Sequence, residues 1–190
     1  MLGSSSSIFD NCIKALVHIS VAKSILELGC GQGKFGKLMQ SEANPLSLCA
    51  VQKIFSPSDV PSLYSLGYEK IIDADILDFF RAGFDETYDL VIALDVIEHF
   101  LYSDVISIIN FALYRSDYML LVWPSAHPQS ATHSEFDRHR ASFELRDLTD
   151  RFNVVFYTQT GFAQINCAHR YHMVMLRGHM NLKVLPPLFG

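Results

Sequence analysis

Short apolar runs of strand length alternate with segments of helical period through most of this chain, and this alternation limits the possible folds more than any other feature. Five runs have the length and apolar content of buried strands: Ser24 to Leu28, Leu46 to Val51, Glu69 to Ile72, Tyr88 to Leu94 and Asp117 to Trp123. Four segments between them have helical spacing: Lys34 to Ser41, Ser58 to Leu66, Leu77 to Ala82 and Glu98 to Tyr114. Strand and helix repeated in this order predict a parallel sheet covered by helices on both faces.

The last third of the chain has a different pattern. A helical segment, Phe143 to Arg151, is followed by two strand-like runs, Val154 to Thr158 and Tyr171 to Leu176, with a loop expected around Gly161 to Ala168. Two late strands with a short connection favour an antiparallel hairpin at the edge of the sheet. The predicted fold class is therefore α/β: a three-layer sandwich with a mostly parallel seven-stranded sheet and an antiparallel C-terminal hairpin.

Polar residues stand where several of these helices are expected to begin. Ser58, Asp75 and Asp95 each precede a helical segment, and their side chains can accept hydrogen bonds from free N–H groups of a first helical turn. All three are candidate N-caps, and Asp95 is also a candidate for the ligand pocket. The apolar-rich stretch Ile8 to Ile19 is also expected to be helical and to pack on the sheet.

Composition and charge exclude several classes of partner. With 190 residues, of which 49% are hydrophobic, the chain can bury one sizeable core. Its 15 Lys+Arg against 20 Asp+Glu give a net charge of −5, and no basic cluster is longer than the pair Arg138 and Arg140, so nucleic acid is not an expected partner. No run approaches the length of a membrane span and the N-terminus lacks a cationic signal-peptide region, so no membrane partner is expected.

The cysteine and histidine spacing argues against a metal site. Four cysteines, at 12, 30, 49 and 167, share no CxxC spacing, which disfavours both a zinc site and a disulfide framework and suits a reducing, cytoplasmic location. His133, Asp137 and His139 lie close in sequence, but their spacing matches no known ligand pattern. The oligomeric state stays open.

The stretch from Glu27 to Gly36, ELGCGQGKFG, carries the most information about function. An apolar strand ends in glycines and runs directly into a helix, so the backbone can turn sharply and present bare N–H groups and a helix N-terminus to a ligand. A P-loop is excluded, because Leu28 replaces its first glycine and Phe35 its Ser/Thr. A dinucleotide fingerprint on Gly31, Gly33 and Gly36 begins two residues late and lacks a suitably placed acid, although an NAD-dependent oxidoreductase remains a rival interpretation.

Four segments in order resemble the motifs of class I S-adenosylmethionine (SAM)-dependent methyltransferases, in particular small bacterial and phage-type domains. They are ILELGCGQGKFG, DADILDF, YDLVIALDVIEH and SEFDRHRASFELRDLTDRF, and together they cover about residues 25 to 152. The resemblance implies a Rossmann-like fold with SAM as cofactor. It also implies one methyltransferase domain over 1–190, made of a helical lead-in (1–23), a cofactor-binding core (24–123), and a substrate loop with the C-terminal hairpin (124–190).

The resemblance also implies roles for individual residues. The methionine end of SAM would be held by the glycine turn and the acid before it, comprising Glu27, Gly29, Cys30, Gly31 and Gly33. Asp75 with Ile76 would hold the adenine, and Asp95 would border the point of methyl transfer. At the end of the second strand the family usually has an acid that accepts hydrogen bonds from the ribose, whereas this chain has Gln52. Loss of charge assistance there is expected to weaken cofactor binding by about tenfold.

The expected function is SAM-dependent methyl transfer to a small-molecule or sugar-like acceptor. Such a displacement chiefly requires positioning of donor and nucleophile, sometimes with removal of a proton, and His99 and His139 are the candidate bases. The alternative is a catalytically silent, methyltransferase-like binding or scaffold subunit, which the departure at Gln52 keeps open.

Overall fold

The computed structural model describes residues 6–42, 45–53, 58–125, 140, 143–164 and 167–179. The elements run in the order η1 (Ser6–Phe9), α1 (Asp10–Ile19), β1 (Ser24–Leu28), α2 (Lys34–Met39), β2 (Ser47–Gln52), α3 (Asp59–Ser65), β3 (Tyr68–Asp73), α4 (Ile76–Ala82), β4 (Tyr88–Leu94), η2 (Ile97–His99), α5 (Tyr102–Leu113), β5 (Ser116–Pro124), α6 (Leu145–Thr149), β6 (Val154–Gln164) and β7 (Cys167–Arg177). The strands form one seven-stranded sheet in the order β3-β2-β1-β4-β5-β7-β6.

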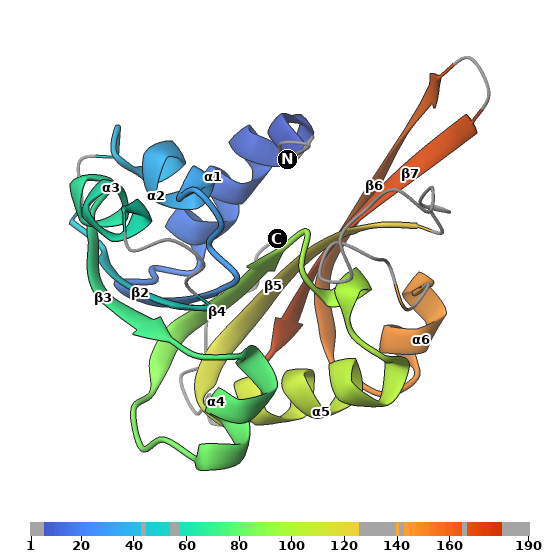
Figure 1. The fold of residues 1–190 in the computed structure, drawn as a ribbon. Coiled ribbons are helices and arrows are strands. Elements are labelled where there is room, and N and C mark those ends of the chain that lie inside the picture. Colours follow the sequence, from blue (N-terminus) through green and yellow to red (C-terminus); the bar gives the residue numbers. More distant parts are fainter. Residues whose placement is uncertain are drawn as a thin grey trace.

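Helices cover both faces of the sheet, as Figure 1 shows, with α1, α2 and α3 on one face and α4, α5 and α6 on the other. The pairs from β3 to β5 are parallel, whereas β7 pairs antiparallel with both β5 and β6. Successive side chains of β1 point to opposite faces, so Leu26 joins the core under α4 and α5 while Ile25 joins the core under α1 and α2. The predicted α/β fold class, with its edge hairpin, is confirmed.

The direction of strand order reverses beside β1. The chain proceeds from β1 outward to β2 and β3 and then returns to place β4 on the other side of β1. In open sheets of this kind, ligands bind outside the carboxyl ends of the strands where the order reverses. Gly29 follows β1 and Asp95 follows β4, so the predicted cofactor residues flank this position.

One predicted helix is interrupted in the structure, and two of the three candidate N-caps do not cap a helix. The segment predicted as one helix from Glu98 to Tyr114 is broken: η2 ends at His99, Phe100 and Leu101 are extended, and α5 begins at Tyr102. The prediction that Asp95 caps this helix is therefore wrong. Asp75 does cap α4, whereas the side chain of Ser58 makes no capping hydrogen bond to α3.

The C-terminal hairpin is longer than predicted. The loop expected around residues 161–168 is instead mostly strand, because Gly161 pairs with Arg170 and the antiparallel pairing of β6 and β7 continues to Gln164 and Cys167. Figure 1 shows the hairpin projecting well beyond the rest of the sheet. Within the described ranges, no helix is long and apolar enough to span a membrane.

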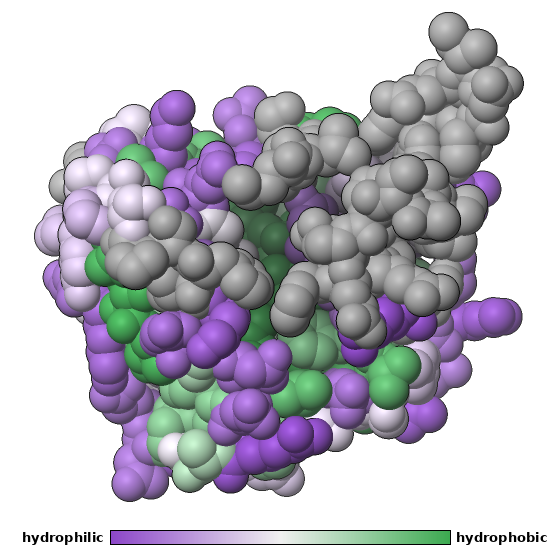
Figure 2. Space-filling view, in the orientation of Figure 1, coloured by the Kyte–Doolittle hydropathy of each residue, from purple (hydrophilic) through white to green (hydrophobic). Residues whose placement is uncertain are grey.

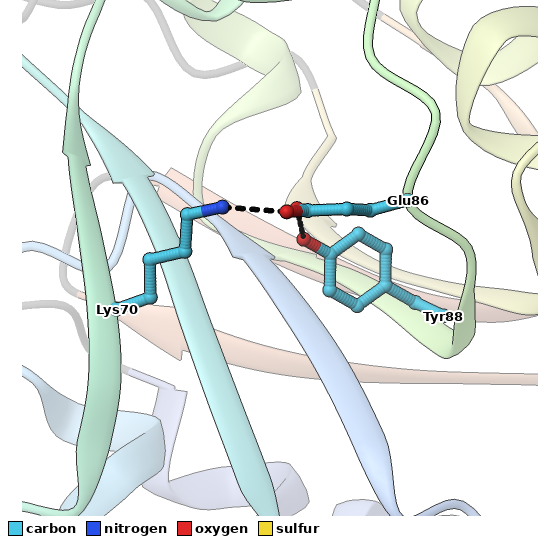
Figure 3. A network of polar contacts seen from close by, with 3 residues as sticks. All are labelled: Lys70, Glu86 and Tyr88. Carbon is cyan, nitrogen blue, oxygen red and sulfur yellow. Dashed lines mark hydrogen bonds and ion pairs between the residues drawn. The ribbon is translucent and has the colours of Figure 1, made fainter.

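A polar network lies at the end of β4 away from Asp95 (Figure 3). The Lys70 ammonium contacts Glu86 Oε1 at 2.7 Å, and the Tyr88 hydroxyl donates to Glu86 Oε2 at 2.8 Å. These contacts join β3 to the start of β4, two strands that are not neighbours in the sheet. Both charged partners are about half exposed, so the network stabilises the fold only modestly.

Candidate functional site

The turn after β1 has a shape that only glycine allows at its first position. Gly29 has φ +69° and its N–H donates to Val51 O at 2.8 Å. A Cβ there would lie 2.8 Å from Val96 Cγ2, so a side chain would collide with the segment after β4. Gly33 precedes α2 with φ +78°, where a Cβ would meet Leu66 of the segment after α3 at 2.6 Å. The turn is therefore packed tightly at both ends.

Gly31, at the middle of the turn, is the opposite case. It is exposed, has φ +54°, and a Cβ added to it would meet no atom within 4 Å. Open space therefore lies beside Gly31 at the carboxyl end of β1. Without a side chain at this position, the backbone can approach a ligand closely.

Gln52 at the end of β2 contacts this turn directly. Its Oε1 accepts a hydrogen bond from the Gly31 N–H, and its Nε2 donates to Gly31 O at 3.2 Å. Cys30 Sγ lies 3.5 Å from the same Oε1. An amide can donate and accept at once, so Gln52 pairs with both backbone groups of Gly31, which a carboxylate could not do. The expected contact of Gln52 with a ribose stays a prediction.

Glu27 is buried beneath the turn and has one side-chain donor. The Tyr68 hydroxyl donates to Glu27 Oε2 and accepts from the Gly36 N–H at 3.2 Å. Burial raises the pKa of Glu27 from 4.5 to about 7, although the bond from Tyr68 opposes this. Burial and the nearby Glu27 together raise the pKa of Cys30 to about 12, so Cys30 is a thiol and not a nucleophilic thiolate.

Asp75 and Ile76 lie at the start of α4. Asp75 Oδ1 accepts from the backbone N–H groups of Leu77 at 2.8 Å and Asp78 at 3.4 Å. Its Oδ2 has no partner within the described part of the chain, and the residue is exposed, so this oxygen can accept a hydrogen bond from a ligand. Ile76 is buried and anchors the first turn of α4 in the core.

Asp95 has a backbone conformation that is uncommon for a residue with a side chain. Its φ is +56°, its N–H donates to Val122 O at 2.9 Å, and its carboxylate oxygens are buried. Strained conformations of this kind collect at functional sites. The carboxylate interacts electrostatically with Lys34 at the start of α2. An acidic and a basic side chain therefore lie beside the glycine turn.

Glu98 and His99 follow in η2. Burial and the nearby Asp95 raise the pKa of Glu98 well above its ordinary value. Its Oε2 is buried without a hydrogen-bond partner among the described residues. His99 is partly buried in the same turn, and the Arg140 N–H reaches the Glu98 carbonyl oxygen at 2.8 Å. His139, and the group His133 and Asp137 considered with it, lie outside the described residues.

The structure thus brings the predicted residues of the glycine turn together with Gln52. Asp95 joins them through Val96, which contacts Gly29. Sequence reasoning missed Tyr68 and Lys34. Tyr68 begins a strand, and nothing in the local pattern indicates its contact with Glu27. Lys34 directly follows the glycine turn, so it could have been noted as a positive charge at the start of a helix. Figure 2 shows a hollow near the middle of the molecule, over the region of β4 in Figure 1, with a hydrophobic floor.

No protein-family model and no curated protein matches this sequence. Solved structures do match the fold. TehB from Haemophilus influenzae is 16% identical with a TM-score of 0.65, and the alignment covers 93% of this chain but only 64% of TehB. The N-terminal domain of EvdMO1 with S-adenosylhomocysteine (SAH) bound is 13% identical with a TM-score of 0.63, covering 91% of this chain and 82% of that one.

The N-methyltransferase NodS from Bradyrhizobium japonicum is 16% identical with a TM-score of 0.60, covering 91% of this chain and 98% of NodS. The chain therefore has the Rossmann-like fold of class I SAM-dependent methyltransferases, and the resemblance drawn from its motifs is confirmed at the level of the fold.

Proposed function

We propose that this protein is a SAM-dependent methyltransferase that acts on a small-molecule or sugar-like acceptor. The observation that carries the proposal is the open space against Gly31, at the strand-order reversal of a methyltransferase fold. Three positive-φ glycines in this turn, one of them exposed to open space, suit a backbone that approaches a ligand closely.

The residues around the turn fit the parts of such a cofactor. Gly29, Gly31 and Gly33, with Cys30 between them, would lie along the methionine part, and Glu27 would attract its ammonium group directly or through water. Asp75 Oδ2 suits the amino group of an adenine, with the first N–H groups of α4 at Ile76 beside it. Gln52 would meet the ribose while holding Gly31.

Bound SAM would supply an electrophilic methyl group for transfer to the acceptor's nucleophilic atom, and the proton that this atom carries would have to be removed. Asp95 would border this point. We assign the role of base to His99, with His139 as the other candidate.

The proposed acceptor class follows from one structural neighbour and from the charge of the chain. EvdMO1, which shares the fold at 14% identity, was crystallised in the presence of SAH and D-fucose. The negative charge of this chain favours neither nucleic acid nor an anionic surface. A small neutral acceptor is the class consistent with both.

Calorimetry tests the cofactor assignment. We expect SAM and SAH to bind to the purified protein, and Gly31→Asp to abolish this binding by placing a charged side chain in the open space beside the turn. Gly83→Asp is the matched control, because Gly83 also has positive φ and open space around its Cβ but lies at the far end of α4. Absence of heat with a folded wild-type protein, or equal binding by both variants, would contradict the proposal.

The second candidate is a methyltransferase-like subunit without activity. It is favoured by the pairing of Gln52 with both backbone groups of Gly31, because these hydrogen bonds satisfy the backbone of the turn without a ligand. Both candidates allow SAH binding. Only the enzyme produces SAH from SAM above background when a panel of small acceptors is supplied, so a coupled SAH assay separates them.

A further inference from the structure

The side chain of Tyr68 connects the start of β3 to the cofactor site across the intervening strand β2. It packs in the core under α1 and α2 and is 2% exposed. Although β2 separates β3 from β1 in the sheet, the Tyr68 hydroxyl reaches Glu27 near the end of β1. Tyr68 can therefore act on the proposed cofactor site through Glu27 without contacting a ligand itself.

The ring of Tyr68 packs against two glycines at the start of α2. A Cβ on Gly36 would lie 2.6 Å from Tyr68 Cε2, and a Cβ on Gly33 would lie 3.3 Å from the same atom. The Tyr68 hydroxyl accepts a hydrogen bond from the Gly36 N–H at 3.2 Å. This N–H belongs to the first turn of α2, where backbone donors lack partners within the helix. The ring therefore has a fixed position beneath the glycine turn.

The same hydroxyl donates to the carboxyl of Glu27. An ionised carboxylate has no hydrogen, so the hydrogen of this bond then comes from Tyr68. Because the Gly36 N–H donates to the phenol oxygen, the phenolic hydrogen is available for Glu27. A donor in this position favours the ionised carboxyl and opposes the effect of burial on the pKa of Glu27.

Glu27 has a second oxygen that a ligand can use. Its Oε2 is bonded to Tyr68, whereas Oε1 has no hydrogen-bond partner in the described part of the chain and is not fully enclosed. Cys30 is the other titratable group that interacts with Glu27, and its pKa of about 12 keeps it neutral. Burial and the nearby Glu27 also raise the pKa of Tyr68. Of these three groups, only Glu27 changes charge near neutral pH.

We propose that Tyr68 is a positioning residue of the cofactor site: its hydroxyl fixes the Glu27 carboxyl beneath the glycine turn and keeps it ionised for the ammonium group of the cofactor. This rests on the proposed function, because it takes SAM as the ligand that Glu27 attracts. Loss of the hydroxyl alone should change the charge of Glu27 near neutral pH and, through that charge, the affinity for the cofactor. A tyrosine that only packed in the core would change neither in this way.

Carbon-13 NMR of glutamate-labelled protein tests this role without a ligand. The carboxyl resonance of Glu27, assigned with Glu27→Gln, should titrate with a midpoint of about 7 in wild type. Tyr68→Phe keeps the ring against Gly36 but removes the donor, so it should raise this midpoint by about one pH unit. Tyr88→Phe is the matched control. Tyr88 also begins a strand and donates to a glutamate, but its partner is Glu86 in the network of Figure 3, so the Glu27 midpoint should not move.

SAH calorimetry between about pH 6.5 and about pH 8.5 gives the second readout. A midpoint raised by about one unit lowers the ionised fraction of Glu27 about fivefold near pH 7. Tyr68→Phe should therefore bind SAH more weakly than wild type by about this factor near pH 7, and the difference should shrink towards about pH 8.5 as Glu27 ionises in both proteins. Tyr88→Phe should match wild type throughout this range.

An unchanged Glu27 midpoint in Tyr68→Phe would overturn the proposal, as would a loss of SAH affinity by the same factor at every pH. If Tyr68→Phe does not fold, wild-type protein grown with 3-fluorotyrosine decides: its hydroxyl is a stronger donor, so the Glu27 midpoint should fall, and an unchanged midpoint overturns the proposal. If wild type does not bind SAH, the proposed function fails together with this role. If it binds SAH while Tyr68→Phe keeps the wild-type midpoint, only the role of Tyr68 fails.

Discussion

Replacing Glu27 with glutamine should abolish a loss of stability that the wild-type protein undergoes as the pH rises. Glu27 titrates near 7 in the folded protein and near 4.5 when unfolded, so between these values the folded state binds more protons. Stability therefore falls as pH increases through this window and is constant above it. The difference between about 7 and 4.5, at about 1.4 kcal/mol for each pH unit, corresponds to about 3.5 kcal/mol over the whole transition.

Glutamine has the same shape and can still accept the hydrogen bond from Tyr68, but it does not titrate. Urea denaturation from about pH 5 to about pH 8 covers most of this window and should therefore show the stability of wild type falling by about 2.5 kcal/mol relative to Glu27→Gln. Glu98, whose pKa is also raised, is present in both proteins and cancels in the difference.

Glu86→Gln is the matched control for this experiment. Hydrogen bonds from Lys70 and Tyr88 lower the pKa of Glu86, so the stability it contributes is lost only as the pH falls below its ordinary value. Its profile should run parallel to that of wild type in the tested range. Parallel profiles for wild type and Glu27→Gln as well would refute the reasoning, because Glu27 would then be ionised in the folded protein at every pH tested.

Three further predictions concern the cofactor residues. SAH affinity should rise through neutral pH in wild type, because ionised Glu27 attracts the ammonium, and calorimetry should find no such rise in Glu27→Gln. Gln52→Glu should bind SAH about tenfold more tightly through charge-assisted ribose bonds; weaker binding would show instead that pairing with Gly31 shapes the turn. Asp75→Ala should lose about 1 kcal/mol of stability in thermal melting and also SAH affinity, whereas Asp75→Ser should keep the cap and lose only affinity.

The central sheet could be predicted from sequence because burial on both faces leaves a strong signal. Ser24–Leu28 and Tyr88–Leu94 have the predicted bounds, since each is a mostly apolar run that is followed by a residue with positive φ, Gly29 or Asp95. The cap at Asp75 was predictable for a local reason, because an aspartate before a helix satisfies N–H groups close to it in sequence.

Features that depend on distant partners could not be predicted in the same way. Helical periodicity continues through Phe100 and Leu101, but the chain leaves the helix there after burying Glu98 beside Asp95. Gly161 suggested a loop, yet pairing with β7 satisfies its backbone regardless of side chain. Gln52 lies at the end of β2 and pairs with Gly31 in the turn after β1. Neither local sequence alone indicates this contact.

A crystal structure of the protein with SAH tests the central claim most directly. The account predicts density along residues 29–33, with the adenine near Asp75 and the sulfur facing Asp95. SAH density elsewhere would contradict it. So would the absence of SAH density at saturating SAH while Gln52 still pairs with Gly31.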